Sequence, residues 1–427
     1  MFDLLRLPGV KPVDLRTGSN RITIVAEVVD DNPPVCEGCG KPMYRHGKRK
    51  NTFADTPMEM QPVRLEVERP RYRCDVCKNM VVPDLAFLDE RRRATKRLVD
   101  VVRERCLGTT FHDMADHTGL SVNSVKNIAL DMIAELDRTV RYETPVILGI
   151  DEVNLAGDMR CVLTNLATNN VFNMLPQRTQ EHLKPFFRDL RDRERVEWVC
   201  TDMWRPFKRS FAKYLPNAKL VIDKFHVLKA ASEALETERK ICQAQLSKNQ
   251  RIQVKKSIRW ITLKRPKNLT QEEQDALAEV RRSFPAIAEA YDFKEMFYRI
   301  YDDPNVDSAK RALEAWENSL PEKGLDDFKR LAKTVHNHYD DIFMYWNSPV
   351  RITNAYTECL NGLTKLANRM GRGYSYEIIR AKVLYAKYAR KVGSGVRIAA
   401  MSGNQQTVEY GPHIPTLVES AESGDLD

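Results

Sequence analysis

Apolar and polar residues recur along this chain with two different periods, and the changes of period divide it into segments. The stretch "MEMQPVRLEVERPRYRC", residues 58–74, alternates apolar and polar positions with the period of two that predicts β-strands. From Leu88 the pattern becomes helical and basic. Residues 109–136 then predict two helices joined by a turn at Gly119, and Ser121 is of a type favoured at helix N-termini. We therefore expect a strand module followed by a helical hairpin.

The pattern changes to short strands after Pro145. Three apolar runs, "VILGID", "RCVLTNLAT" and "VFNML", are separated by turn-like residues and predict a meander of three strands. A helix, "TQEHLKPFFRDLRDR", a fourth strand, "VEWVCTD", another helix, "WRPFKRSFAKYL", and a fifth strand, "AKLVID", follow in this order. The first, fourth and fifth of these predicted strands end in an acid, at Asp151, Asp202 and Asp223.

Residues 231–345 predict helix after helix, rich in charge and interrupted by prolines, without a strand pattern. One more helix is expected after "SPVRITN", ending near Gly371 and Gly373. The residues of its predicted buried stripe are Ala355, Cys359, Leu363, Leu366 and Met370. The polar residues of another face are Asn354, Glu358, Asn361, Lys365 and Arg369.

Composition adds size and charge to this picture. The chain has 427 residues, 42% of them hydrophobic, and a prior of about 100–200 residues per domain predicts about two to four domains. Its 68 Lys and Arg against 59 Asp and Glu give a net charge of +9, which favours a polyanionic partner such as nucleic acid. No stretch approaches the roughly 20 apolar residues of a membrane span, and the N-terminal residues lack a secretory signal. We expect a cytosolic protein without membrane contact.

Four of the nine cysteines form two pairs with identical spacing, Cys36-x2-Cys39 and Cys74-x2-Cys77. Disulfides are not expected in a reducing compartment. Two such pairs supply four thiolates for one tetrahedral Zn²⁺ with no open position for a substrate, so the predicted site is structural and the strands between the pairs form a zinc ribbon. The alternative, four unrelated core thiols, leaves the matched spacing unexplained. We interpret His46 as a surface or DNA-facing residue rather than a fifth ligand.

Basic residues near the ribbon and polar residues of the helical hairpin are candidate DNA contacts. Arg45, Lys48 and Arg49 cluster beside His46, and this pattern fits phosphate contact and a plain solvated loop equally well. A helix-turn-helix would present its second helix to the major groove, although many helical hairpins do not bind DNA. The candidate contacts of that helix are Ser121, Asn123, Ser124, Lys126 and Asn127.

The acids at the ends of the predicted strands are the candidate catalytic residues. Carboxylates at the ends of neighbouring strands can converge on a divalent cation while the apolar strands hold them rigid. One such acid alone is usually an ordinary solvated residue, and the repetition favours a site. Glu358 would supply a third metal ligand, with Lys365 and Arg369 binding a phosphodiester backbone on either side; the alternative is a solvated face of spaced charges.

With these residues the chain resembles the DDE transposases of bacterial insertion sequences, specifically the ISL-three family. The most specific parts of the resemblance are the paired cysteines with "YRHG", the "GIDE" strand, "DKFHVLK", and "NAYTECLNGL" with "GRGYSYE". The resemblance covers roughly residues 30–395. It implies a multidomain α+β protein with an N-terminal zinc ribbon, a helix-turn-helix module, and an RNase H-like α/β core interrupted by an all-α insertion.

Six segments follow from the pattern and the resemblance together. They are 1–87 with the ribbon at 36–80, 88–142 with the helix-turn-helix, 143–230 as the first part of the core, 231–345 as the helical insertion, 346–395 as the final helices of the core, and 396–427 as a disordered tail.

The resemblance implies that Asp151, Asp202 and Glu358 form the acidic triad. They would bind two Mg²⁺ or Mn²⁺ ions, in addition to the one structural Zn²⁺ of the ribbon. Asp223 and His226 match an Asp-x-x-His element of related transposases. Such a histidine would contact the scissile phosphate or flanking bases, and a satisfied core histidine is the alternative.

Two neighbours of the first acid leave its identity as a ligand open, because Glu152 and Asp158 lie close to Asp151 in the sequence. The expected function is transposition: binding of terminal inverted repeats, strand cleavage at the element ends, and joining of the freed 3′-hydroxyl to target DNA. Two ends must meet, so we expect a homodimer or higher assembly on double-stranded DNA, in the cytoplasm and nucleoid of a prokaryote. The alternatives are a DNA-binding regulator derived from a transposase and a metal-dependent nuclease without strand transfer.

Overall fold

The computed structural model describes residues 5–29, 32–155, 157–203, 211, 213–246 and 258–393, with side chains to residue 386. Within these residues, unit 1 takes the chain up to Arg141 and from Ala367 onward, and unit 2 takes Tyr142–Leu366. The tail predicted at 396–427 lies outside the described residues, as does most of the helix predicted for "WRPFKRSFAKYL". In the described parts of the chain, no helix is both long and apolar enough to cross a membrane.

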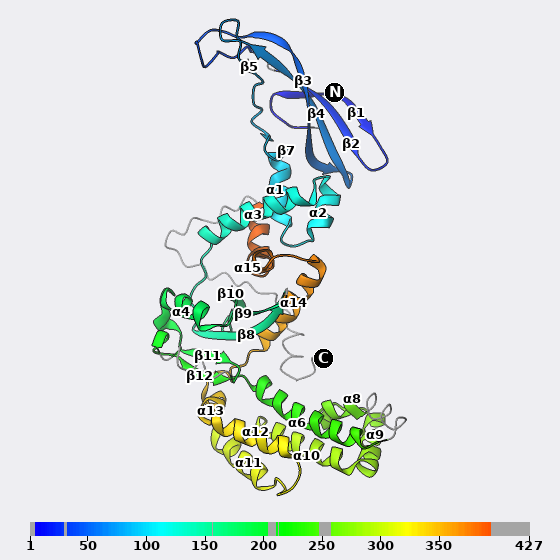
Figure 1. Cartoon of the computed structure of the whole chain (residues 1–427), viewed down its shortest axis with the longest axis vertical. Coiled ribbons are helices and arrows are strands. Elements are labelled where there is room, and N and C mark those ends of the chain that lie inside the picture. The colour runs from blue at the N-terminus through cyan, green and yellow to red at the C-terminus, as the bar shows by residue number, and fades with distance from the viewer. Residues whose placement is uncertain are drawn as a thin grey trace. The chain divides into compact units, whose positions relative to one another are not determined.

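Unit 1 contains a seven-stranded sheet of order β1-β2-β4-β3-β7-β6, in which β5 pairs with β4 (Figure 1). Its strands are β1 (Val10–Thr17), β2 (Ile22–Val28), β3 (Tyr44–Met58), β4 (Gln61–Arg73), β5 (Met80–Val81), β6 (Leu88–Asp89) and β7 (Ala94–Thr95). The alternation predicted from residue 58 onward is mainly β4, which pairs antiparallel with β3. Leu65 and Val67 of β4 are fully buried and pack with Phe53 of β3 in the core of this sheet.

Three helices follow the sheet in unit 1: α1 (Lys96–Arg105), α2 (Phe111–Thr118) and α3 (Val122–Thr139). The predicted turn is confirmed, because Gly119 ends α2 with a left-handed φ of 72°. The predicted N-cap is also confirmed, since the Ser121 side chain accepts a hydrogen bond from the Ser124 N–H. A Cβ at Gly119 would lie 2.9 Å from Pro62, so this turn packs closely on the sheet.

The helix α15 (Tyr376–Gly393) packs against α1 and α3 of unit 1. Arg380 Nη1 donates to Asp137 Oδ1 of α3 at 2.7 Å. Lys382 Nζ donates to the carbonyl oxygens of Cys106 at 3.0 Å and Thr109 at 2.7 Å, just after α1. The segment 346–395, predicted as the final helices of the core, is therefore divided: its residues up to Leu366 lie in unit 2, and α15 lies in unit 1.

Unit 2 contains a five-stranded sheet of order β10-β9-β8-β11-β12 (Figure 1). Its strands are β8 (Ile147–Leu155), β9 (Asp158–Asn165), β10 (Asn170–Leu175), β11 (Trp198–Thr201) and β12 (Lys219–Ile222). β8, β9 and β10 form the predicted antiparallel meander, and β11 pairs parallel with both β8 and β12. Helix α4 (Gln180–Arg188) buries Leu183 and Phe187 against this sheet. The predicted RNase H-like core is thus present.

One strand boundary differs from the prediction. β8 does not end at Asp151 but continues to Leu155, because buried Val153 and Leu155 extend its alternation and pair with β9. Asp202 and Asp223 directly follow β11 and β12, as predicted. Asp151 is therefore held inside a strand, whereas the other two acids occupy strand ends.

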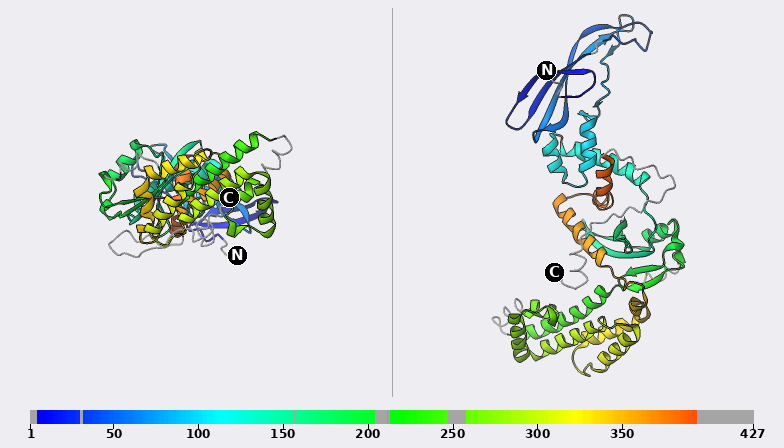
Figure 2. Two further views of the ribbon diagram at one scale, coloured as in Figure 1. Left: turned by 90° about the horizontal axis from the view of Figure 1, so that it is seen from below. Right: turned by 180° about the vertical axis from the view of Figure 1, so that it is seen from behind.

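The chain between this sheet and the last helix of unit 2 is helical, as the sequence predicts. Its helices are α6 (Lys224–Ala244), α8 (Arg259–Leu263), α9 (Gln271–Ser283), α10 (Pro285–Ile300), α11 (Val306–Asn318), α12 (Asp326–Asn337) and α13 (Tyr339–Asn347). The long helix α6 packs against α10 and α12 (Figure 2). Pro285 begins α10, where a missing N–H leaves no helical hydrogen bond unmade.

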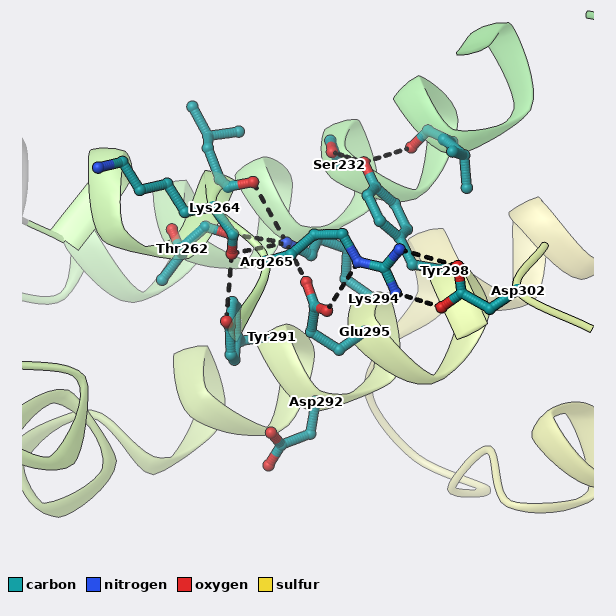
Figure 3. A network of polar contacts seen from close by, with 12 residues as sticks. Ser232, Thr262, Lys264, Arg265, Tyr291, Asp292, Lys294, Glu295, Tyr298 and Asp302 are labelled. Atoms are coloured by element: carbon teal, nitrogen blue, oxygen red, sulfur yellow. Dashed lines mark hydrogen bonds and ion pairs between the residues drawn. The ribbon is translucent and has the colours of Figure 1, made fainter. Parts of the chain in front are cut away.

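A buried ionic group joins α8 to α10 (Figure 3). Lys294 is fully buried; its Nζ lies 2.6 Å from Glu295 Oε1 and donates to the carbonyl oxygen of Thr262 at 3.0 Å. Arg265 lies 3.7 Å from the other oxygen of Glu295 and 2.6 Å from Asp302. Burial lowers the pKa of Lys294, and the charge of Glu295 opposes that shift. Removing one member would leave its partner charged and buried, so the group fixes the packing of these helices.

Candidate functional site

The four paired cysteines lie together, as the sequence predicts. Their sulfur atoms all lie within 4.8 Å of one another. One pair precedes β3 and the other follows β4, and the pairing of Tyr44 with Arg73 brings these strand ends together. Four thiols at this spacing are a tetrahedral ligand set for Zn²⁺, with zinc–sulfur distances of about 2.3 Å. The ligands of the cluster are Cys36, Cys39, Cys74 and Cys77.

The pKa values of two of these thiols are shifted by their neighbours in the cluster. The Cys77 N–H donates to Cys74 Sγ at 3.3 Å, and this bond lowers the pKa of Cys74 to about 7. Hydrogen bonding with Cys39, together with burial, raises the pKa of Cys77 to about 12. The thiolates repel one another unless a cation neutralises them, so Zn²⁺ binding would release protons here.

The basic residues after the first cysteine pair lie on strand β3 and not in a loop. Lys48 Nζ lies 3.4 Å from Glu27 and 3.1 Å from Glu68 on the neighbouring strands. These pairs were not predictable from the sequence, because they depend on strand register. Exposed ion pairs of this kind are weak because water screens them, so they leave Lys48 able to contact a phosphate. The other exposed basic and imidazole side chains at this end of β3 are Arg45, His46 and Arg49.

The second helix of the hairpin presents polar side chains to solvent. Ser124 is half-buried, and its hydroxyl lies 2.8 Å from that of the cap residue Ser121. Val125 and Ile128 face the core of unit 1. The exposed polar residues of the first turns are Ser121, Asn123, Lys126 and Asn127. Exposed amide, hydroxyl and ammonium groups are side chains that can contact base edges or phosphates.

A second cluster of ligating side chains lies in unit 2. Among the described residues, Asp223, His226 and Glu358 offer ligand atoms within 4.8 Å of one another. Asp223 follows β12, His226 lies in the first turn of α6, and Glu358 lies in the first turn of α14 (Ala355–Gly371). Of the predicted triad, Glu358 belongs to this cluster, and Asp151 and Asp202 lie outside the 4.8 Å set.

Asp151 lies directly beside this cluster. Its Oδ1 is 3.5 Å from His226 Nε2, and its Oδ2 accepts a hydrogen bond from Asn361 Nδ2 of α14 at 2.8 Å. The residue is 7% exposed, so these two contacts replace most of its hydration. Strand β8 and helices α6 and α14 therefore converge at Asp151.

Asp202 and Glu152 contact a common arginine. Arg178 Nη1 lies 2.7 Å from Asp202 Oδ2, and Arg178 Nε lies 2.8 Å from Glu152 Oε1. The parallel register pairs Gly149 of β8 with Cys200 of β11, so Asp151 and Asp202, each two residues further on, reach the same level of the sheet. Their carboxylates nevertheless contact different cationic side chains, His226 and Arg178.

Burial keeps part of this site protonated. It raises the pKa of Glu358 to about 7, with a further contribution from the charge of Asp223. Burial also raises the pKa of Asp223 to about 6. Burial alone would lower the pKa of His226, but its contact with Asp151 and the charge of Asp223 outweigh that effect and raise it to about 9. A divalent cation would favour the ionised carboxylates and displace these protons.

A buried asparagine fastens α14 to the sheet. The Asn354 N–H donates to Asp223 Oδ1 at 3.0 Å, and its Nδ2 donates to the carbonyl oxygen of Ile150 at 3.0 Å. A Cβ at Gly149 would collide with Thr164 Oγ1 and would lie 2.8 Å from Asn354 Oδ1. Glycine at this position therefore lets the helix terminus approach β8 closely. Hydrophobic periodicity carries no signal for such polar contacts, and the role of Asn354 was missed for that reason.

The buried face of α14 differs from the prediction. Leu366 and Met370, assigned to the buried stripe, are 45% and 58% exposed. The side that is buried carries polar residues that bond to the sheet or to the helix itself, and Thr357 Oγ1 lies 2.6 Å from Thr164 Oγ1. Lys365 and Arg369 are exposed. The buried residues of α14 are Ala355, Tyr356, Thr357, Leu360, Asn361 and Thr364.

The side chains of this site fit a hard divalent cation. Asp223 Oδ2 is buried and makes no hydrogen bond within the described residues, whereas His226 Nε2 lies 3.5 Å from Asp151 Oδ1. Such groups are costly to bury unless something binds them. Carboxylate oxygens suit both Mg²⁺ and Mn²⁺.

The chain matches known proteins over most of its length. Residues 148–383 match a transposase domain of the ISL3 type. Residues 32–77 match the zinc finger of the transposases of IS204, IS1001, IS1096 and IS1165, and residues 83–132 match the helix-turn-helix domain of transposase family ISL3. The chain is also similar to the transposase for insertion sequence element IS1001 of Bordetella parapertussis, with 22% identity over 366 residues that cover 83% of this chain and 90% of that protein.

Proposed function

Because the chain belongs to the ISL3 family of insertion-sequence transposases, we propose that it cleaves the ends of its element and joins them to target DNA at the acidic site of unit 2. Transposases cut and transfer DNA strands, and the matches to a zinc finger and a helix-turn-helix domain support DNA binding. The proposed catalytic acids are Asp151, Asp202 and Glu358, with Asp223 and His226 as auxiliary residues.

One observation carries this proposal. Acids and a histidine that lie far apart in the sequence, from Asp151 to Glu358, come together beside the unit 2 sheet. Carboxylates held above their ordinary pKa by burial cost stability, so a purely structural role does not account for them. A cation-binding role accounts for them, because a bound cation stabilises the ionised carboxylates.

The proposed chemistry divides between the acids and the basic residues of α14. A bound divalent cation supplies a Lewis acid that activates the attacking water or 3′-hydroxyl and stabilises the departing oxygen. Asp151, Asp202 and Glu358 would hold two Mg²⁺ or Mn²⁺ ions. Lys365 and Arg369, both exposed, would bind backbone phosphates on either side of the scissile bond.

His226 has a separate proposed part. With a pKa raised to about 9 it is positively charged at neutral pH and lies 3.5 Å from Asp151. It would orient the Asp151 carboxylate and present a positive charge to the scissile phosphate. As a metal ligand it would first have to lose its proton.

Recognition of the terminal inverted repeats is assigned to unit 1. Arg45, Lys48 and Arg49 would contact phosphates and set the register of the protein on DNA. The polar residues at the start of α3 and its cap residue would read base edges in the major groove: Ser121, Asn123, Ser124, Lys126 and Asn127. Two element ends must be joined to one target, so we propose a homodimer or higher assembly, acting on the DNA of a prokaryotic cell.

The test is cleavage and joining of DNA that carries the element's own flanking repeats, with Mg²⁺ or Mn²⁺. We expect Asp151→Asn, Asp202→Asn and Glu358→Gln each to lose both activities by more than about a thousandfold. Asp158→Asn is the matched control, because Asp158 is an exposed acid of β9 paired with Arg160. Full cleavage by Asp202→Asn would remove that residue from the triad.

Asp223→Asn in the same assay tests whether Asp223 is a metal ligand or an auxiliary residue. The amide still has an oxygen that can accept the hydrogen bond from the Asn354 N–H. A loss as large as that of Asp202→Asn would make Asp223 a ligand together with Glu358. A loss within about tenfold would leave it an auxiliary residue. Binding of the repeats without cutting would favour a DNA-binding regulator, and cutting without joining a nuclease.

A further inference from the structure

Arg178 contacts two acids beside the proposed site, Asp202 and Glu152, and has no part in the proposed chemistry. Its side chain is 6% exposed. It bridges Glu152 of β8 and Asp202 after β11 through two different nitrogens, at 2.8 Å and 2.7 Å. A single guanidinium therefore holds two carboxylates that would otherwise repel each other at the edge of the site.

The contact with Asp202 competes with metal binding. Arg178 Nη1 contacts Asp202 Oδ2, an oxygen that a divalent cation would also need. Displacement of the arginine would free Oδ2 of Asp202 for a cation.

The position of Arg178 in the chain allows that movement. It lies between β10, which ends at Leu175, and α4, which begins at Gln180, and so outside the strand ladder. Thr179, the N-cap residue of α4, makes no side-chain capping bond there. Glu152, by contrast, lies within β8, and Asp202 directly follows β11. When a cation arrives, the loop residue is the partner that can be displaced.

We propose that Arg178 is an internal counter-ion, which holds Asp202 and Glu152 together when no divalent cation is bound and is displaced from Asp202 when one binds. This inference rests on the proposed role of Asp202 as a metal ligand. Arg178 is then a positioning residue that keeps the acids in place and sets the threshold for metal binding. Its removal should strengthen metal binding, an effect opposite to that of losing a structural support.

The first test measures Mn²⁺ binding to the full chain without DNA, by electron paramagnetic resonance of the free ion. Arg178→Gln should bind Mn²⁺ about tenfold more tightly than the native protein, within the range typical of coupling between competing ligands. Arg160→Gln is the control: it removes the same charge from β9, and Arg160 pairs with Asp158. Its Mn²⁺ affinity should stay at the native value.

Asp202→Asn distinguishes failure of this inference from failure of the proposed function. If Asp202→Asn leaves Mn²⁺ binding unchanged, Asp202 is not a metal ligand and the proposed function loses that ligand. If Asp202→Asn weakens binding while Arg178→Gln matches or falls below the native protein, the counter-ion proposal alone is overturned. No measurable binding by either the native protein or Arg178→Gln also overturns it.

A second measurement uses the native protein and so does not depend on how a variant folds. At 6% exposure, Arg178 should be protected from phenylglyoxal, an arginine-selective reagent. Saturating Mn²⁺ should raise its modification rate, measured by mass spectrometry of the peptide that contains it, whereas Arg160 should keep its rate. An unchanged rate at Arg178 in saturating Mn²⁺ would show that it is not displaced.

Discussion

The two ligand clusters of this protein are assembled in different ways. The four cysteines come from two short turns at the paired ends of β3 and β4. The acidic cluster draws Asp223, His226 and Glu358 from a strand end and two helices, with Asp151 from a fourth element beside them. The ligands of the first cluster lie closer together in the sequence than those of the second. This difference decides which of the two clusters a metal must hold together.

The surroundings of the two clusters differ accordingly. The small core at the cysteines comprises Cys36, Met43, Tyr72 and Cys74, with the other two cysteines packed against it. The acids lie between elements of two large cores, one of the sheet with α4 and one of the helical insertion. At the cysteines, a metal supplies folding energy. At the acids, the fold supplies the site and a metal need only bind to it.

The largest effect that would sharpen this contrast is loss of zinc. Removing Zn²⁺ with a chelator, or replacing Cys74 by Ser, should cost up to about 10–16 kcal/mol of local stability, as in small zinc modules. Because the core of the adjoining sheet is independent, unfolding should be confined to the cysteine turns and the ends of β3 and β4. Hydrogen exchange, with zinc content by mass spectrometry, measures both.

Cys242→Ser is the matched control for that prediction, since Cys242 lies on α6, away from the cluster. It should keep one zinc and native exchange. If chelation left the exchange of the cysteine turns unchanged, the claim that the metal holds this cluster together would be wrong.

The same contrast explains what the sequence could predict. Cys-x2-Cys spacing is a local pattern, and the four cysteines were found from it directly. The succession of strands along the chain was also predictable, because short apolar runs and turn residues mark β8 to β12. The buried face of α14 was not, because hydrophobicity assigned Leu366 and Met370 to the inside. Burial there follows polar contacts made by Asn354 and Asn361, and these appear only when distant segments pack.

Arg178 illustrates the same limit. Nothing near it in the sequence distinguishes it from the many other basic residues of a chain with 68 Lys and Arg. Its contact with Asp202 and Glu152 depends on the crossing of a loop over two strands. Pairing between residues of different elements is a property of the fold and leaves no periodic signal.

A smaller effect tests whether the fold holds the acidic cluster. Gly149→Ala places a Cβ against Thr164 and Asn354, which should destabilise unit 2 by about 3 kcal/mol through overpacking. Urea denaturation, with a probe of unit 2, measures the change. Gly362→Ala is the control, because a Cβ there meets nothing within 4 Å and alanine favours the helix α14. Equal midpoints for the two variants would contradict the close packing at Gly149.

The smallest effect concerns the stability lost by keeping an acid buried. The folded pKa of Glu358 is raised to about 7, above the ordinary 4.5, mainly by burial. The native state therefore binds more protons than the unfolded state between pH 4.5 and 7, and stability falls as the pH rises through that window. Glu358→Gln removes this titration. Without metal it should be more stable than the native protein at pH 8 by about 2 kcal/mol, with the difference vanishing near pH 4.

Thermal or urea unfolding of both proteins at several pH values measures that difference. The same measurement in saturating Mn²⁺ tests the opposite expectation. A cation bound by Glu358 stabilises only the native protein, so added Mn²⁺ should reduce or reverse the advantage of Glu358→Gln. The zinc cluster should show the opposite relation, because Cys74→Ser never gains stability in any condition. If Glu358→Gln were no more stable than the native protein at pH 8, Glu358 would be an ordinary packed residue. The contrast between the zinc cluster and the acidic cluster would then be wrong for Glu358.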